Sequence, residues 1–175
     1  EASNRNVLVK GGKYLEAVKD ADVIVFDKTG TLTNANPQVQ KVTPLNGYSR
    51  DEVLRIAACL EEHFPHSVAN AIVNQAKKEG LVHEEEHAKV EYIVAHGIAT
   101  TLHGLHTVIG SDHFIFEDDG VEKTQELEDI ITSLEKDGAG SLIYLAIDNQ
   151  VAGIISIYDP LKQEAKQVIH ELKNL

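Results

Sequence analysis

The sequence predicts an α/β fold in which one sheet-containing domain is interrupted by an inserted α+β domain with an antiparallel sheet. Apolar residues 23–26 form a strand pattern that stops at Asp27, as at the carboxyl edge of an open sheet. Between 90 and 110, short alternating runs joined by brief turns predict antiparallel strands. The pattern over 151–172 changes from strand to helix, which is typical of α/β domains. The 175 residues suffice for one domain with a hydrophobic core of moderate size, or for a smaller domain inserted into part of another.

The first elements lie on either side of Asp27. A helical turn or two is predicted at 14–18, before the strand pattern at 23–26. Turn-forming residues dominate 34–48, and a short strand is predicted among them at 39–42. We therefore expect the chain to leave the first sheet near residues 33–37.

Two helices are predicted next. Ser49 is a good N-cap with Glu52 three residues on as its capping-box partner, and apolar spacing continues from there to about Glu62. A second helix begins near Ser67, which we expect to cap it, and ends at Gly80.

The second half of the chain mixes both periodicities. Alternating or continuous apolar runs predict strands, and spacing of three to four residues predicts helices. The predicted strands lie at 90–94, 98–102, 107–109, 142–147 and 151–158, and the predicted helices at 111–116, 121–136 and 162–172.

The composition narrows the class of protein. The formal net charge is −12 and the pI is near 5.1. An acidic surface repels phosphate backbones and anionic lipid, so we expect no nucleic-acid partner and no docking on such membranes. Cys59 is the single cysteine, which excludes an intrachain disulfide.

The sequence has no segment that predicts a membrane crossing. No apolar run approaches the ~20 residues that a transmembrane helix needs, and no signal peptide is present. The chain begins at Glu1 and has no methionine, so we expect it to be a piece of a longer protein.

The turn after the strand at 23–26 suits phosphate chemistry. Asp27 is followed by Lys28, Thr29, Gly30 and Thr31, which offer a cation, hydroxyls and backbone N–H groups. A carboxylate held at a sheet edge in this way can act as a nucleophile and become an aspartyl-phosphate.

The run Asp-Lys-Thr-Gly-Thr-Leu-Thr at 27–33 resembles the phosphorylation motif of P-type ATPases at all seven positions. The resemblance implies that Asp27 accepts the γ-phosphate of ATP, while Lys28 and Thr31 help to hold phosphate. Asp27 and the carbonyl of Thr29 would supply part of a Mg²⁺ site.

A second stretch, residues 59–72, is similar to the nucleotide-binding loop of heavy-metal-transporting P-type ATPases. Glu61 lies five residues before His66, as in that family, but Ser67 stands where the family has proline. The resemblance implies that His66 stacks on adenine and that Glu61 accepts a hydrogen bond from its exocyclic amine. His63 is a lower-ranked candidate.

Four further positions match this family by their order in the chain. Ala95 and Gly97 occupy a glycine-x-glycine turn in which the first glycine is replaced, and Gly110 matches another family glycine. Glycines there let the backbone approach a nucleotide closely. Asp159 begins an aspartate-proline hinge, where it would steady the hinge or reach the ribose.

The resemblance also implies a domain plan. Residues 1–33 and 156–175 would belong to an incomplete haloacid-dehalogenase (Rossmann-like) phosphorylation domain, and 34–155 to the inserted nucleotide-binding domain. The implied ligands are ATP and Mg²⁺. The implied partners are the membrane helices, the actuator domain and the rest of the phosphorylation domain of the same pump, on the cytoplasmic side of a membrane. The loops that complete the magnesium site do not follow Lys173, so we expect ATP binding with little turnover.

Two alternatives remain open from the residues. A haloacid-dehalogenase-type phosphatase would carry a general acid at position 29, where this chain has threonine. A non-enzymatic nucleotide- or metal-binding module would use clustered histidines, although we favour solvated histidines at these positions. The histidines concerned are His83, His87, His96, His103, His106 and His113.

Overall fold

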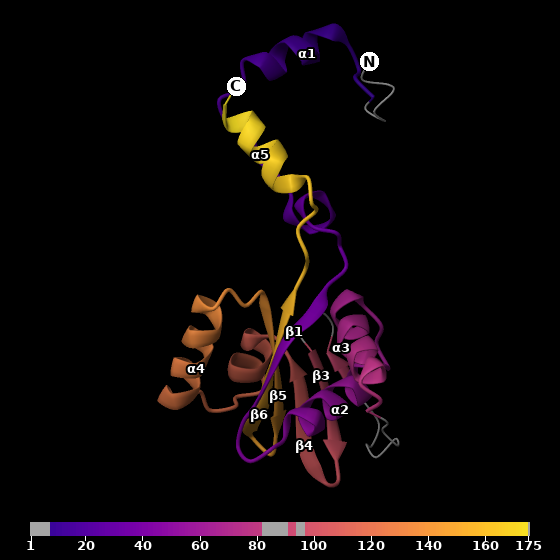
Figure 1. Ribbon diagram of the computed structural model, residues 1–175. Coiled ribbons are helices and arrows are strands. Elements are labelled where there is room, and N and C mark those ends of the chain that lie inside the picture. The colour runs from indigo at the N-terminus through magenta and orange to yellow at the C-terminus, as the bar shows by residue number, and fades with distance from the viewer. Residues whose placement is uncertain (1–7, 82–90, 94–96, 175) are drawn as a thin grey trace.

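A six-stranded antiparallel sheet with strand order β1-β6-β5-β4-β3-β2 forms the centre of the protein (Figure 1). The computed structural model describes residues 8–81, 91–93 and 97–174. The strands are β1 (Gln38–Pro44), β2 (Glu91–Ile93), β3 (Gly97–Leu102), β4 (Leu105–Gly110), β5 (Ser141–Ile147) and β6 (Gln150–Tyr158). The predicted antiparallel meander is confirmed, because β2, β3 and β4 pair in sequence order.

Helices cover both faces of this sheet. The α-helices are α1 (Gly12–Lys19), α2 (Arg50–Glu61), α3 (Ser67–Lys78), α4 (Gln125–Lys136) and α5 (Ala165–Lys173), with single wide turns η2 (Lys28–Leu32) and η3 (Phe114–Asp118). Leu145 and Ile155 pack with α2 and α3, whereas Tyr144 and Ile154 pack with α4 and η3. Neighbouring residues of one strand thus enter opposite cores, and this explains why β6 is apolar on both faces.

The two helices on one face begin at different kinds of cap. Ser49 and Glu52 form the predicted capping box of α2. The expectation that Ser67 caps α3 is wrong, because Ser67 is already the first helical residue. His66 is extended, with φ −144° and ψ 177°, and its side chain accepts a hydrogen bond from Ala69 N–H. An ion pair joins the start of α2 to the end of α3, because Arg50 donates hydrogen bonds to both carboxylate oxygens of Glu79.

Helices α1 and α5 stand away from the sheet in Figure 1, and the chain reaches them through a narrow waist. In this part the predicted buried strand at 23–26 is wrong: Val23 is 77% exposed and Val25 is 88% exposed. A strand becomes buried only when other strands and helices pair with it and cover it. Among the described residues, none pairs with this segment.

Two predicted helices are shorter than expected. Residues 121–124 precede α4 although Val121 is in the core, and 162–164 precede α5. Thr124 caps α4 by accepting from Leu127 N–H, which fixes the later start. None of the helices in the described ranges has the length and apolar character that a membrane crossing demands.

Candidate active site

The segment after Asp27 folds into a tight turn. Thr29 has φ −77° and ψ 119°, and Gly30 has φ 79° and ψ −16°. These angles are those of a type II β-turn, whose third residue needs positive φ and is therefore usually glycine. A wider loop encloses this turn, because Thr33 N–H donates to the carbonyl of Lys28, five residues earlier, at 3.1 Å. Asp27 and Thr31 are exposed at its two sides.

Thr33 ties this turn to the returning chain. Its side chain is buried, and its Oγ1 accepts from Gly30 N–H at 3.2 Å and donates to Asp159 Oδ2 at 2.5 Å. The same oxygen lies 3.2 Å from the Lys28 carbonyl, but a hydroxyl has one hydrogen and the shorter contact takes it. The other carboxylate oxygen of Asp159 accepts from Asn36 N–H at 3.0 Å.

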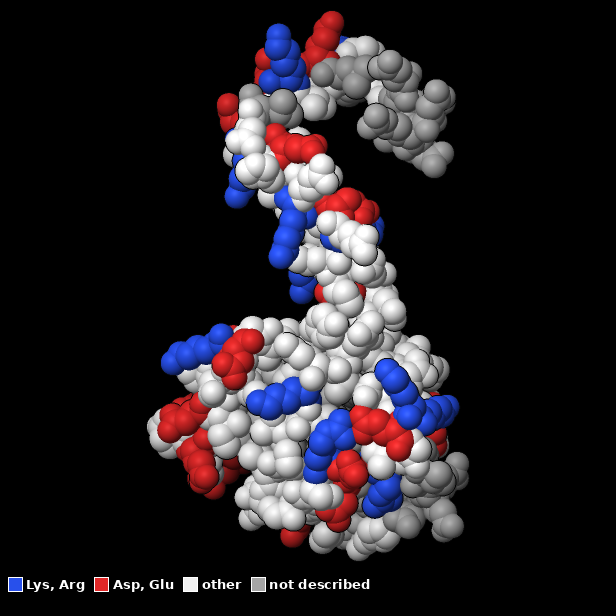
Figure 2. Space-filling model, viewed as in Figure 1, with Lys and Arg blue, Asp and Glu red and all other residues white. Residues whose placement is uncertain are grey.

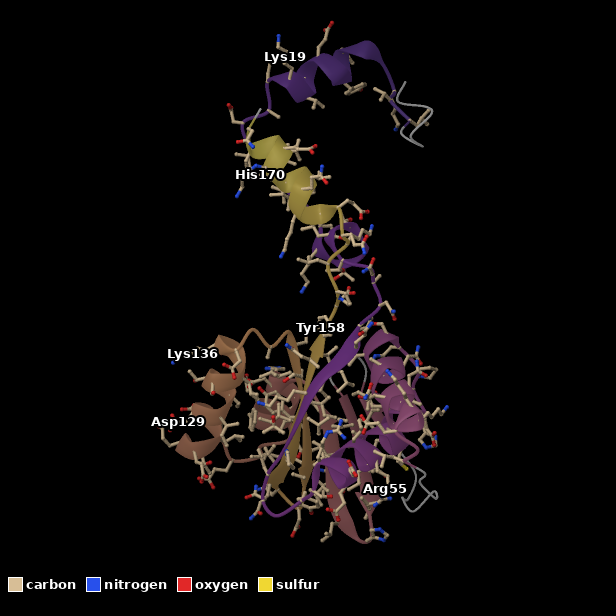
Figure 3. All side chains as sticks on the ribbon, in the orientation of Figure 1. Lys19, Arg55, Asp129, Lys136, Tyr158 and His170 are labelled. Atoms are coloured by element: carbon tan, nitrogen blue, oxygen red, sulfur yellow. The ribbon has the colours of Figure 1, made fainter. Side chains whose placement is uncertain are left out.

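Backbone hydrogen bonds continue this connection past the sheet. Asn34 N–H donates to the Pro160 carbonyl, and Lys162 N–H donates to the Leu32 carbonyl, both at 2.9 Å. Tyr158, labelled in Figure 3, marks the point where β6 leaves the sheet. Asp159 therefore lies in a two-stranded waist, with both its oxygens occupied by hinge residues.

Glu61 and His66 lie at the end of α2 and the start of α3. The Glu61 residue is 4% exposed, and its Oε2 has no hydrogen-bond partner among the described residues. Burial raises the pKa of this carboxyl to about 7. His66 Nε2 lies 3.4 Å from Oε2, but burial is what raises this pKa.

The cap fixes the tautomer of His66. Because Nδ1 accepts from Ala69 N–H at 3.2 Å, the ring hydrogen of a neutral imidazole lies on Nε2. Nε2 is 3.4 Å from Glu61 Oε2 but outside hydrogen-bond geometry, so Oε2 has no partner among the described residues. The imidazole is about half exposed, with 47% of its surface accessible. A buried carboxyl thus lies beside an accessible aromatic ring.

Gly97 and Gly110 face each other across the β3–β4 ladder. A Cβ at Gly97 would lie 2.3 Å from Phe114 Cδ1 and 2.5 Å from the Ile109 carbonyl oxygen. The core under β3 therefore requires glycine here whatever binds above it. Ala95 lies outside the described residues.

A cavity of about 410 Å³ lies between the turn at 28–33 and the sheet domain. Its lining includes Lys28, Thr29, Ser67, Val68, Tyr158 and Asp159. Of the predicted site residues, the structure brings Lys28, Thr29 and Asp159 together around this cavity. It leaves Asp27, Thr31, Glu61, His66, Gly97 and Gly110 outside the lining.

The sequence did not predict a role at the site for Thr33, Asn36 or Lys162. Lys162 Nζ donates to the Gly30 carbonyl at 2.8 Å, so a residue of the returning chain also holds the turn. Thr33 is the last residue of the seven-residue motif at 27–33. Its place in that motif was the only feature of the sequence that pointed to it. The other two contact the site through hydrogen bonds across more than 120 residues, which no local pattern reveals.

Metal-binding groups are sparse in the part of the chain that the structure describes. No cluster of three or more His, Cys, Asp or Glu side chains occurs there. His106 pairs with Asp119 at 2.8 Å and His113 with Glu117 at 3.0 Å, while His83, His87 and His96 lie outside the described residues. The Asp27 carboxylate and the Thr29 carbonyl are hard oxygen donors of the kind that Mg²⁺ takes. They could fill only two of its about six positions.

Comparison with known proteins identifies the family to which the chain belongs. Residues 21–175 match the family of haloacid dehalogenase-like hydrolases, and the chain belongs to that family.

Heavy-metal-transporting P-type ATPases are the relatives that it matches. It is 33% identical over 174 residues to a cadmium, zinc and cobalt-transporting ATPase of Bacillus subtilis (strain 168). It is 36% identical over 169 residues to a probable copper-exporting P-type ATPase of Archaeoglobus fulgidus. These alignments cover 99% and 97% of this chain but only 23% and 20% of the relatives.

Solved structures agree with this family resemblance. A zinc-transporting PIB-type ATPase in the E2·Pi state superposes with a TM-score of 0.69 at 31% identity, over 99% of this chain and 27% of the other. The N-domain of HMA8, a copper-transporting P-type ATPase, superposes with a TM-score of 0.58 at 25% identity. That match covers 69% of this chain and 99% of the N-domain. The predicted resemblance and fold class are confirmed.

Proposed function

We propose that this chain is the ATP-binding and phosphorylation region of a heavy-metal-transporting P-type ATPase. The buried Glu61 carboxyl carries the proposal, because one of its oxygens has no partner among the described residues and lies beside the accessible His66 ring. An unmet buried polar atom costs about 1–3 kcal/mol, so a ligand that supplies its hydrogen bond is favoured. The exocyclic amine of adenine is such a donor, and its ring stacks on imidazole.

Asp27 is the proposed nucleophile. A carboxylate oxygen attacks the γ-phosphorus of ATP, the bond to the bridging oxygen breaks, and ADP leaves with that electron pair. Lys28 and Thr31 hold the transferred phosphoryl group, and the Asp27 carboxylate with the Thr29 carbonyl would hold Mg²⁺. The metal would neutralise phosphate charge when bound.

The remaining predicted residues shape the site. Gly97 and Gly110, together with Ala95, are proposed nucleotide-site residues because they match the glycine positions of the family. Asp159 steadies the hinge. We propose residues 34–155 as the nucleotide-binding domain and 1–33 with 156–175 as two parts of the phosphorylation domain.

The whole protein would use these parts to drive a cation across a membrane. Its partners would be the membrane helices, the actuator domain and the remainder of the phosphorylation domain, with this region on the cytoplasmic side and no nucleic acid involved. The chain alone would bind ATP with little or no turnover. A soluble phosphatase is disfavoured because Thr29 supplies no general acid.

Calorimetric titration with ATP, with and without Mg²⁺, tests the adenine pocket. The variants are His66→Ala and His66→Asn, since asparagine keeps an acceptor for Ala69 N–H but removes the ring. We expect both to bind ATP at least about tenfold more weakly, or roughly 1.4 kcal/mol. His106→Ala is the matched control and should bind like the unchanged protein.

The pair of variants separates two roles. Unchanged binding by His66→Asn would refute stacking on the ring, and a loss confined to His66→Ala would assign the effect to the helix cap. Absence of saturable ATP binding by the unchanged protein would overturn the proposed pocket.

A further inference from the structure

The peptide group between Thr29 and Gly30 has two alternative orientations. Type I and type II turns differ by a rotation of about 180° of this central peptide plane. Gly30 has no Cβ and tolerates the backbone angles of both turns. The sequence of the turn therefore leaves the orientation open, and other contacts must select it.

Thr33 selects the observed orientation. Gly30 N–H donates to Thr33 Oγ1 at 3.2 Å. In a planar trans peptide the C=O and N–H bonds point in opposite directions. The Thr29 carbonyl therefore points away from Thr33 as long as this hydrogen bond is made.

Asp159 in turn orients the Thr33 hydroxyl. The hydroxyl donates its one hydrogen to Asp159 Oδ2, and this contact anchors Oγ1 where it accepts from Gly30 N–H. Without the carboxylate, the Thr33 side chain is free to change rotamer and to take its acceptor oxygen away from Gly30 N–H. The three groups form a chain from the hinge to the peptide plane, and Thr33 is 3% exposed, so little water competes with it.

A second contact from the returning chain holds the next peptide. Lys162 Nζ donates to the Gly30 carbonyl at 2.8 Å. Both peptide groups of Gly30 are thus fixed by contacts that depend on the waist. The waist and the turn are consequently coupled through side chains as well as through the backbone.

We propose that Asp159 and Thr33 are positioning residues that aim the Thr29 carbonyl, so that the hinge sets one Mg²⁺ ligand of the phosphorylation site. The inference rests on the proposed function, because the carbonyl acts as a metal ligand only in that reaction. Opening the Thr33–Asp159 contact would release the peptide plane and weaken Mg²⁺ binding without altering Asp27.

NMR of the 175-residue chain tests the orientation directly. The residual dipolar coupling of Gly30 N–H reports the direction of that bond, and amide hydrogen exchange reports its protection. We expect Thr33→Val and Asp159→Ala to change the coupling and to raise the Gly30 exchange rate at least about tenfold. Thr33→Ser keeps the hydroxyl and should match the unchanged protein. Unaltered amide shifts of β3 to β6 would show that each variant is folded.

Titration with Mg²⁺ alone, followed by the carbonyl ¹³C shift of Thr29, tests the consequence. Thr33→Val should need at least about threefold more Mg²⁺ for half of the shift change, and Thr33→Ser should not. A Gly30 N–H that keeps its direction and protection in Thr33→Val would overturn the relay. No response of the Thr29 carbonyl to Mg²⁺, or an equal response in all variants, would overturn the control of the metal ligand. Neither result bears on the ATP titration, which tests the adenine pocket separately.

Discussion

Glu61 combines deep burial with a titratable group, and this makes it a probe of the pocket. Its pKa is raised by burial from about 4.5 to about 7, because the charged form loses its hydration in the folded protein. The folded state therefore prefers the protonated carboxyl. The resulting stability is fully present below about pH 4.5 and is lost as pH rises toward and through 7.

We predict that Glu61→Gln flattens the pH dependence of stability. At pH 8 the variant should be more stable than the unchanged protein, by up to about 3 kcal/mol, because it buries no charge. Urea unfolding at pH 5 and pH 8 measures both free energies. Equal pH slopes for the two proteins would show that Glu61 is not the group responsible.

Gly97 is constrained by packing beneath the sheet. We predict that Gly97→Ala lowers the free energy of unfolding by about 1–3 kcal/mol, because the new Cβ meets Phe114 and the Ile109 carbonyl inside van der Waals contact. Gly12→Ala is the control, since nothing lies within 4 Å of its Cβ position. Chemical denaturation measures both, and an unaffected Gly97→Ala would mean that Phe114 moves aside at no cost.

The sequence predicted some properties of individual residues and missed others. Asp27 was predicted as a site residue from a local motif, and Glu61 and His66 from their spacing and family resemblance. The burial of Glu61 and the contact between Thr33 and Asp159 were not predicted. Both depend on segments that meet only in the fold, and the contact joins residues 126 positions apart. Such contacts leave no periodic signal in one sequence.

At the scale of elements, the start of α3 depends on an unusual cap. We predict that His66→Ala lowers the free energy of unfolding by about 0.5–2 kcal/mol, whereas His66→Asn changes it little, because asparagine also accepts from Ala69 N–H. Thermal or urea unfolding distinguishes them. Equal destabilisation by both substitutions would show that the ring packs or bonds in a way that the cap does not explain.

Most strands and helices were predictable because their patterns are local. The capping box at Ser49 and the apolar run of β6 located two elements within a few residues. The strand at 23–26 failed for the opposite reason. Its composition specifies burial, but burial needs partner strands, and the described residues pair in a sheet that does not include it. An apolar pattern indicates what a segment can become, and the partners decide whether it does.

At the scale of the whole molecule, both hydrophobic clusters lie between the sheet and the segments that cover it, which are α2, α3, α4, η3 and the residues just before α4. Their buried members run from Val42 to Ile157. Figure 2 shows charged groups of both signs scattered over this body and along the narrower part above it.

We predict that residues 34–160 fold by themselves. Their unfolding midpoint should stay within a few degrees of that of the full chain, because a loss of about 1 kcal/mol would shift it by about 4–8 °C in a domain of 60–100 residues and by less in a longer one. Calorimetry of both chains measures this, with ATP titration as a second reading. A markedly lower midpoint would show that α1, α5 or the turn after Asp27 stabilises the sheet.

The paired waist limits how the two parts of the molecule can move. Its outgoing and returning segments pair side by side at Thr33 and Leu161, through hydrogen bonds from Asn34 N–H to the Pro160 carbonyl and from Lys162 N–H to the Leu32 carbonyl. A two-stranded ribbon of this kind flexes across its flat side, but twisting or sliding would break its hydrogen bonds. We therefore expect the sheet domain to move by bending of this ribbon, which would carry the start of α3 toward and away from the turn at 28–33, with which it lines one cavity.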